Sequence, residues 1–263
     1  MILLASIVSF AGCRKAAPEK RVVRIAAAAD LTTAFGELGK TFAAKTGITP
    51  ELTFAASGML EKQIEQGAPF FLFAAANKDY VDRAIKAGKC DRASERIYAR
   101  GQLVVWTAPG KPAPATLEDL AKPEFKKIAI ANPETAPYGK AAKEALETAA
   151  IYDQVKDRLV LGENVLAALA YAKDGNADAA IVALSLAMET KGARLAISPR
   201  WFSPLDQALV VCGTGPEADA ARQFADFVTS MEGRQLMVPY GFSIPPEHIG
   251  DHDGERPAPP PTQ

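Results

Sequence analysis

Three short segments have the composition expected of an anion-binding site. They read "AAAADLTT" (26–33), "FAASGMLEKQ" (54–63) and "NPETAPYGKAA" (132–142), and each places small or turn-forming residues directly before a helix-forming run. The first amides of a helix have no intrahelical acceptor and carry part of the helix dipole, so they suit an anion. Small residues also let a ligand approach the backbone closely. We predict that these segments face one cleft.

Helix capping offers a purely structural explanation of the same residues. Asp30 can cap the helix that follows it by accepting a hydrogen bond from the amide of Thr32 or Thr33. Ser57 can cap the next helix in the same way, and Pro137 favours a helix start by itself. If the Asp30 carboxylate instead points into the cleft, the ligand must bring a proton, a cation or a hydroxyl donor. For an inorganic oxyanion we predict that Asp30 turns away and caps its helix, whereas an inward Asp30 would weigh against molybdate as the ligand.

The residue inventory favours binding over catalysis. Both histidines, His248 and His252, lie in or beside the segment 249–263, which is too rich in Pro and charge to pack and is predicted to be disordered. The core therefore has no imidazole to serve as a general base or metal ligand. No P-loop or GxGxxG motif follows a strand, so no cofactor is predicted. We predict that the chain is not an enzyme, and a pocket carboxylate with a strongly raised pKa would revive that alternative.

Length, charge and pattern define the class of protein. The 263 residues have a formal net charge of −1 with acids and bases interspersed, which argues against a nucleic-acid partner. Strand-like and helical runs alternate along the folded body, which predicts an α/β protein with parallel sheets covered by helices. Such sheets bind ligands at the carboxyl ends of their strands. We predict two lobes, one formed by 21–103 and 209–248 and the other by 104–208.

The N-terminal segment 1–20 indicates export. It reads "MILLASIVSFAGCRKAAPEK", and its apolar run is too short to span a bilayer. The run ends in small residues before Cys13, as in a lipoprotein signal, so Cys13 is predicted to carry the lipid anchor. The alternative is an ordinary cleaved export signal with an incidental cysteine. Either interpretation places the protein in the periplasm or at the cell surface.

The two other cysteines, Cys90 and Cys212, have no CxxC spacing and no histidine partner. Plain burial explains them. They could also form one disulfide in an oxidising compartment, or lie too far apart to do so. The sequence leaves their pairing open.

Several segments, in order, resemble the molybdate-binding (ModA) family of ABC importers. They are "IAAAADLTTAFGELGKTFAAKTG", "FAASGMLEKQIEQGAP", "IAIANPETAPYGKAAKEAL", "GENVLAALAYAKDGNADAAIVALSLA" and "PYGFSIP". The resemblance implies the type II periplasmic-binding-protein fold, in which two lobes close on a tetrahedral oxyanion. It also implies a monomer that binds molybdate or tungstate and delivers it to an ABC permease in the membrane. Alternatives are sulfate, phosphate or a carboxylate as ligand, or a sensor or adhesin domain of the same fold.

The resemblance also suggests which residues bind the ligand. Ser57 matches a serine that binds the anion through its side chain and backbone, while Tyr138 and Val165 match backbone amide donors. These donors contact the oxygens of the anion, so no residue is expected to bind the metal directly. The first loop, Ala29 and Asp30, completes the predicted ligand-binding set, although family members often have Ser, Thr or Asn there, so a neutral donor is lost.

Overall fold

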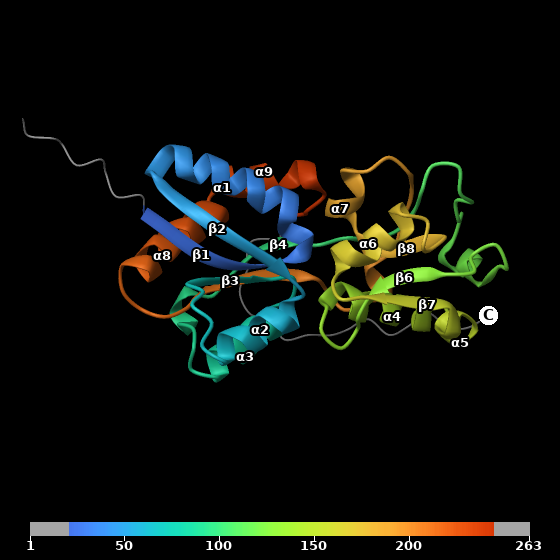
Figure 1. The fold of residues 1–263 in the computed structure, drawn as a ribbon, viewed down its shortest axis with the longest axis horizontal. Coiled ribbons are helices and arrows are strands. Elements are labelled where there is room, and N and C mark those ends of the chain that lie inside the picture. The colour runs from blue at the N-terminus through green and yellow to red at the C-terminus, as the bar shows by residue number, and fades with distance from the viewer. Residues whose placement is uncertain (1–20, 245–263) are drawn as a thin grey trace, which may run out of the picture.

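The computed structural model describes residues 21–244, which form two five-stranded sheets (Figure 1). The first sheet has the strand order β2-β1-β3-β10-β4, and the second has the order β7-β6-β8-β5-β9. In each sheet the three strands at one side run parallel, and the fourth strand is antiparallel to both of its neighbours. The prediction of an α/β protein with two lobes and mainly parallel sheets is confirmed.

The strands are short and mostly buried. Those of the first sheet are β1 (Arg21–Ala28), β2 (Ile48–Ala55), β3 (Leu72–Ala75), β4 (Arg96–Arg100) and β10 (Asp206–Val211). Those of the second sheet are β5 (Leu103–Thr107), β6 (Ile128–Ala131), β7 (Leu159–Gly162), β8 (Ala179–Ala183) and β9 (Ala193–Ala196).

Helices flank each sheet (Figure 1). The first lobe carries α1 (Thr32–Thr46), α2 (Ser57–Glu65), α3 (Lys78–Lys86), α8 (Pro216–Thr229) and α9 (Met231–Met237). The second lobe carries α4 (Pro137–Thr148), α5 (Tyr152–Val155), α6 (Val165–Lys173) and α7 (Leu184–Met188). Short 3-10 turns complete the chain: η1 (Ala29–Leu31), η2 (Arg92–Ser94), η3 (Leu117–Ala121), η4 (Lys156–Arg158), η5 (Pro199–Trp201) and η6 (Val238–Tyr240).

The spacing of apolar residues explains how α1 packs. Phe35, Leu38 and Phe42 recur at helical intervals and are buried against the first sheet and α8. Phe42 meets the ring of Phe224 edge to face, with 5.1 Å between ring centroids. The helix ends at Gly47, whose positive φ of 73° forms a left-handed C-cap that other residues adopt at a cost. Because α1 begins directly after η1 and is packed in place, it also holds the η1 turn in position.

The chain passes from the first lobe to the second between β4 and β5, and returns between β9 and β10. Leu103 already belongs to the second sheet, and Asp206–Val211 already belongs to the first. The strands of the second sheet therefore lie within residues 103–196, and the first sheet resumes at Asp206. The first strand after each crossing, β5 or β10, runs antiparallel to both of its neighbours.

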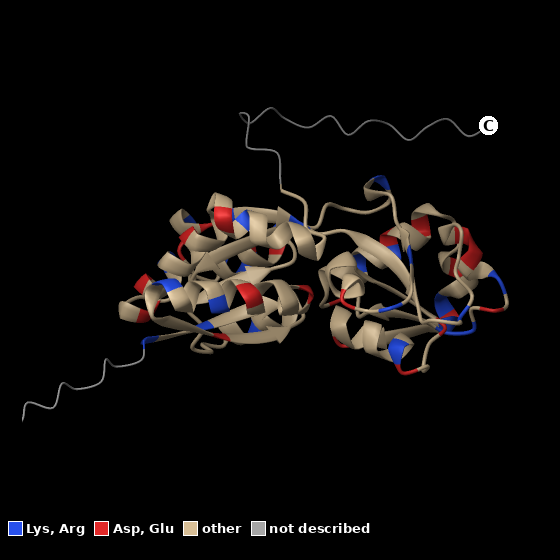
Figure 2. Ribbon diagram, turned by 90° about the horizontal axis from the view of Figure 1, so that it is seen from above, with Lys and Arg blue, Asp and Glu red and all other residues tan. Residues whose placement is uncertain are grey.

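Charged residues are spread over both lobes (Figure 2). Ion pairs join residues of one helix, such as Lys78 and Asp82 of α3, and residues of neighbouring strands, such as Arg100 of β4 and Asp206 of β10. Within residues 21–244, no helix is both long and apolar enough to cross a membrane. The predicted signal, Cys13, both histidines and the predicted disordered tail lie outside the described residues.

A disulfide joins Cys90 and Cys212, which are 122 residues apart in the sequence. It connects the segment after α3 to the end of β10, so it lies entirely in the first lobe. The sequence left the pairing of Cys90 and Cys212 open, and the structure shows that they pair.

Loss of this disulfide is predicted to destabilise the first lobe. A variant with Cys90→Ser and Cys212→Ser should lose about 2 to 5 kcal/mol of unfolding free energy, because the cross-link restricts the unfolded chain. Urea denaturation of protein from residue 21 onward measures this difference. Wild type treated with a reductant should unfold like the variant, whereas equal stability of oxidised wild type and variant would contradict the prediction.

Candidate functional site

A small buried cavity lies between the lobes, where the strands of both sheets end. Its volume is about 10 Å³ in this closed arrangement, which is about the room that one water molecule needs. Its lining consists mainly of small residues and helix starts. The lining residues are Ala28, Ala29, Asp30, Ala55, Ala56, Ser57, Ala76, Ala136, Pro137, Tyr138, Asn164 and Val165. All five residues that the sequence suggested as ligand-binding line this one cavity, and their contact with a ligand stays a prediction.

Four helical segments begin at the cavity, and each is the next element in the chain after a strand. The turn η1 follows β1, and the helices α2, α4 and α6 follow β2, β6 and β7. The amides of Ser57, Tyr138 and Val165 lie in the first turns of these helices, where no intrahelical acceptor exists. Within residues 21–244 they donate to no backbone carbonyl. Three unpaired donors therefore converge from two lobes on one buried space.

Ser57 has a different local role from the predicted helix cap. The N-cap of α2 is Ala56, and Ser57 is the first residue of the helix. Its Oγ accepts a hydrogen bond from the amide of Ala76 at 3.1 Å, and the side chain is 1% exposed. Because the Oγ already accepts, its own proton remains available for a ligand oxygen.

Asp30 does not cap its helix, so the capping alternative is wrong. The N-cap of η1 is Ala28, and the amide of Thr32 is bonded to the carbonyl of Ala29. The Asp30 carboxylate instead accepts from Gln207 Nε2, at 2.6 Å from Oδ2. Burial of the carboxylate raises the pKa of Asp30 to about 7, and hydrogen bonding with Gln207 and Tyr138 opposes that rise.

Gln207 connects Asp30 to two buried tyrosines. Its Nε2 lies 3.5 Å from the hydroxyl of Tyr138, and its Oε1 accepts from the hydroxyl of Tyr98 at 3.4 Å. Burial and the nearby Asp30 raise the pKa of both tyrosines well above the usual value, so both hydroxyls stay protonated. Gln207 comes from β10, Tyr98 from β4 and Tyr138 from α4, so the network crosses between lobes.

Direct contacts between the lobes close the cavity. The amide of Gly58 in α2 donates to the carbonyl of Thr135 at 2.9 Å, and Ser185 in α7 donates to the carbonyl of Asp30 at 2.8 Å. A Cβ on Gly58 would lie 2.8 Å from the Thr135 carbonyl oxygen, closer than such contacts allow. The glycine is therefore required for the two lobes to approach this closely.

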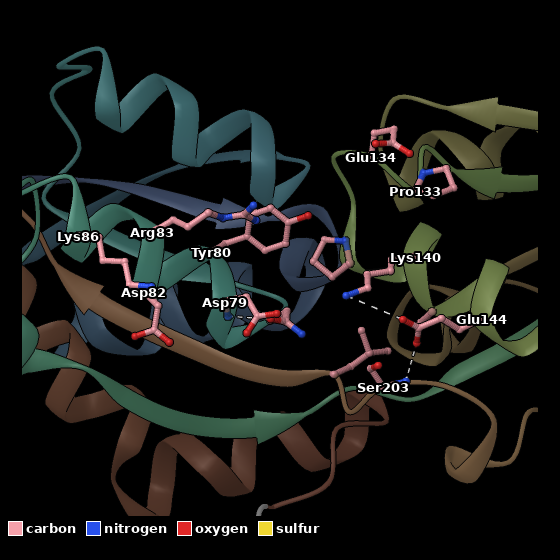
Figure 3. A pocket seen from close by; sticks show the side chains of 14 residues that line it. Asp79, Tyr80, Asp82, Arg83, Lys86, Pro133, Glu134, Lys140, Glu144 and Ser203 are labelled. Atoms are coloured by element: carbon pink, nitrogen blue, oxygen red, sulfur yellow. Dashed lines mark hydrogen bonds and ion pairs between the residues drawn. The ribbon is translucent and has the colours of Figure 1, made fainter.

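A wider groove with a volume of about 490 Å³ lies beside the cavity, between α3 and α4 (Figure 3). It shares Pro137 with the cavity, so the two spaces are neighbours. Both walls of the groove carry charged side chains. On α3 the guanidinium of Arg83 stacks on the Tyr80 ring, 4.1 Å from its centroid. On α4 the ammonium of Lys140 lies 3.9 Å from the carboxylate of Glu144. The groove thus contrasts with the cavity, whose described lining contains no Lys, Arg or His.

Comparisons with known proteins identify the family. The family model described as "Bacterial extracellular solute-binding protein" matches residues 23–243. The chain belongs to this family, within its ModA group of molybdate-binding proteins. The molybdate-binding protein ModA of Rhodobacter capsulatus is 34% identical over 221 residues, with 82% of this chain and 86% of the relative covered. That of Azotobacter vinelandii is 30% identical, with 89% and 94% covered.

A solved structure supports the same assignment. The periplasmic molybdate-binding protein of Azotobacter vinelandii superposes with a TM-score of 0.80 and 26% identity, covering 85% of this chain and all of that one. The resemblance found in the sequence is confirmed, and so is the fold of a two-lobed periplasmic binding protein. The family description as extracellular agrees with the predicted export.

Sequence reasoning missed the residues that hold the first loop. Gln207 and Ser185 lie far from Asp30 in the sequence, and nothing in the spacing connects the three. A signal existed for Gln207, because it is a lone amide in the otherwise apolar run "QALVVC" of a buried strand. Asn164 also escaped notice, although its side chain caps α6 by accepting from the amide of Ala167.

Replacing Gly58 with alanine is predicted to hinder closure of the lobes. The added Cβ meets the Thr135 carbonyl of the other lobe, and overpacking of this kind costs about 1 to 3 kcal/mol. Affinity for a tetrahedral oxyanion should therefore fall by about 10- to 100-fold, as measured by isothermal titration calorimetry. Gly36→Ala is the matched control, since a Cβ at this position in α1 meets nothing within 4 Å. Equal affinities of the two variants would contradict the predicted role of Gly58.

Proposed function

We propose that this protein binds molybdate or tungstate between its lobes and delivers it to the permease of an ABC importer. The observation that carries the proposal is the convergence of unpaired helix-start amides on one buried cavity. The relatives named as molybdate-binding proteins support the choice of ligand. Sulfate, phosphate and small carboxylates are the competing ligands.

Uncharged hydrogen-bond donors suit a dianion that loses its hydration shell when it binds. The amides of Ser57, Tyr138 and Val165 are fixed by their helices, so they bind an oxyanion with little reorganisation. The Ser57 hydroxyl adds a donor whose direction is set by the amide of Ala76. In this proposal every donor contacts an oxygen, and no side chain contacts the metal. The cavity must also widen, because its present volume is smaller than a tetrahedral oxyanion.

The raised pKa of Asp30 calls for comparison with an enzyme active site, since perturbed carboxylates gather at catalytic centres. Within residues 21–244 the cavity lining offers no histidine, cysteine or lysine that could act with it. The relatives carry the names of binding proteins. We therefore assign Asp30 to ligand binding, together with Ala29 of the same turn, and we propose no reaction.

A ligand panel tests the proposal. Protein from residue 21 onward should gain about 2.7 kcal/mol of stability from molybdate or tungstate at 100 times its dissociation constant. Thermal unfolding with molybdate, tungstate, sulfate, phosphate and acetate measures this gain. Ser57→Ala should weaken binding by about 10-fold, since a hydrogen bond to a charged group is lost. Absence of a shift with both molybdate and tungstate would refute the choice of ligand.

We also propose that Cys13 carries a lipid that keeps the protein at the membrane, near its permease. The basis is the segment "FAGC", in which small residues precede the cysteine. Two or more acyl chains give stable anchoring, whereas one chain binds only marginally. Wild type should therefore fractionate with membranes, and Cys13→Ala should appear in the soluble fraction. Soluble wild type that does not differ from the variant would remove this assignment.

A further inference from the structure

One carboxylate oxygen in the cavity has no partner. Asp30 is 1% exposed, and its Oδ2 accepts a hydrogen bond from Gln207 Nε2. Its Oδ1 accepts no hydrogen bond from any group within residues 21–244. No cationic side chain of the described residues lines the cavity. Because an unpaired buried charge is strongly unfavourable, the ionised form of Asp30 does not suit this closed arrangement.

We propose that Asp30 binds the oxyanion as a neutral carboxylic acid, whose Oδ1–H donates a hydrogen bond to one ligand oxygen, so that each dianion is bound together with one proton. This inference rests on the proposed function and adds to it a residue that sets the charge state of the complex. It identifies the ligand class as tetrahedral dianions taken up with a proton.

Electrostatics decides against an ionised Asp30 in the complex. An ionised carboxylate beside a dianion in a cavity of low dielectric would be strongly repelled. A protonated carboxyl removes that repulsion and supplies a donor. Hydrogen bonds from a hydroxyl to a charged oxygen are short and strong. Protonation thus restores at Asp30 the neutral donor that the first loop appeared to lack.

The neighbours of Asp30 determine which oxygen carries the proton. Gln207 Nε2 donates to Oδ2, so the proton belongs on Oδ1, the oxygen left unpaired. The titratable groups around it are Tyr98 and Tyr138, and both stay neutral because burial and Asp30 raise their pKa. From α7, the Ser185 hydroxyl donates to the Asp30 carbonyl and carries no charge. Hydrogen bonding with Gln207 and Tyr138 offsets only part of the cost of a buried charge on Asp30, so its pKa remains raised.

The proposal makes binding pH-dependent in a defined direction. Burial raises the pKa of Asp30 to about 7 in the closed protein, and an exposed Asp in separated lobes titrates lower still. Above about pH 7 the free protein therefore carries an ionised Asp30, whichever way the lobes are arranged. Binding must then take up one proton, so affinity falls about tenfold for each further pH unit. The dependence becomes shallower and vanishes only below the pKa of Asp30 in the free protein.

Calorimetric titration tests this with protein from residue 21 onward, which holds both sheets and the whole cavity. The probes are molybdate and sulfate, because both remain fully deprotonated dianions between about pH 7 and 9, where the free protein carries an ionised Asp30 and binding must take up a proton. Titration in two buffers of different ionisation enthalpy counts the protons taken up. Wild type should take up about one proton per dianion at about pH 8 and lose about tenfold in affinity per pH unit.

Two variants complete the test. Asp30→Asn should bind with no proton uptake and no pH dependence, because its amide donates permanently and can still accept from Gln207. At about pH 8 it should bind at least about 10-fold more tightly than wild type. Asp226→Asn removes an exposed carboxylate on α8 and should keep the wild-type pH dependence.

The outcomes separate the two proposals. If wild type binds molybdate or sulfate with constant affinity and no proton uptake, the role of Asp30 is refuted while the proposed function stands. Loss of binding in a folded Asp30→Asn variant would also refute the proposed role of Asp30. If neither wild type nor Asp30→Asn binds any dianion at any pH, the proposed function itself fails. Circular dichroism establishes that each variant is folded.

Discussion

Unpaired backbone amides in a buried cavity are the constraint on which this structure depends. A single lobe would leave these donors in contact with water, where their attraction for an anion is weak. Only the approach of the second lobe removes the water and brings Ser57 together with Tyr138 and Val165. The parallel strands point their carboxyl ends, and hence the helix starts, toward the same space. The same arrangement of strand ends that defines the fold therefore also builds the proposed anion site.

Close approach of the lobes depends on small groups at the contact. Gly58 donates directly to the opposite backbone, and the alanines around it keep side chains out of the cavity. Gly101 serves the same purpose at the passage between lobes, since a Cβ there would collide with the Tyr138 hydroxyl. Small residues thus permit close approach both where the two lobes touch and where the proposed ligand binds. A mixed, charged surface surrounds this region without entering it.

The parts of the site that follow from sequence are those encoded locally. Ser57, Tyr138 and Val165 each stand at a strand-to-helix turn, so a pattern of strands and helices locates them. The orientation of Asp30 could not be predicted, because it depends on Gln207, which comes from a strand near the other end of the chain. Ser57 was expected to cap a helix, but the helix begins one residue earlier than that role requires.

The position of β10 has a consequence for synthesis of the chain. The second sheet is built from one continuous stretch, so all its strands are available once β9 has been made. The first sheet is different, because β10 lies between β3 and β4 and reaches the sheet last. Until then β3 and β4 each have an open edge, and open edges invite pairing with other chains. A newly exported molecule is therefore most exposed to aggregation in the lobe that was begun first.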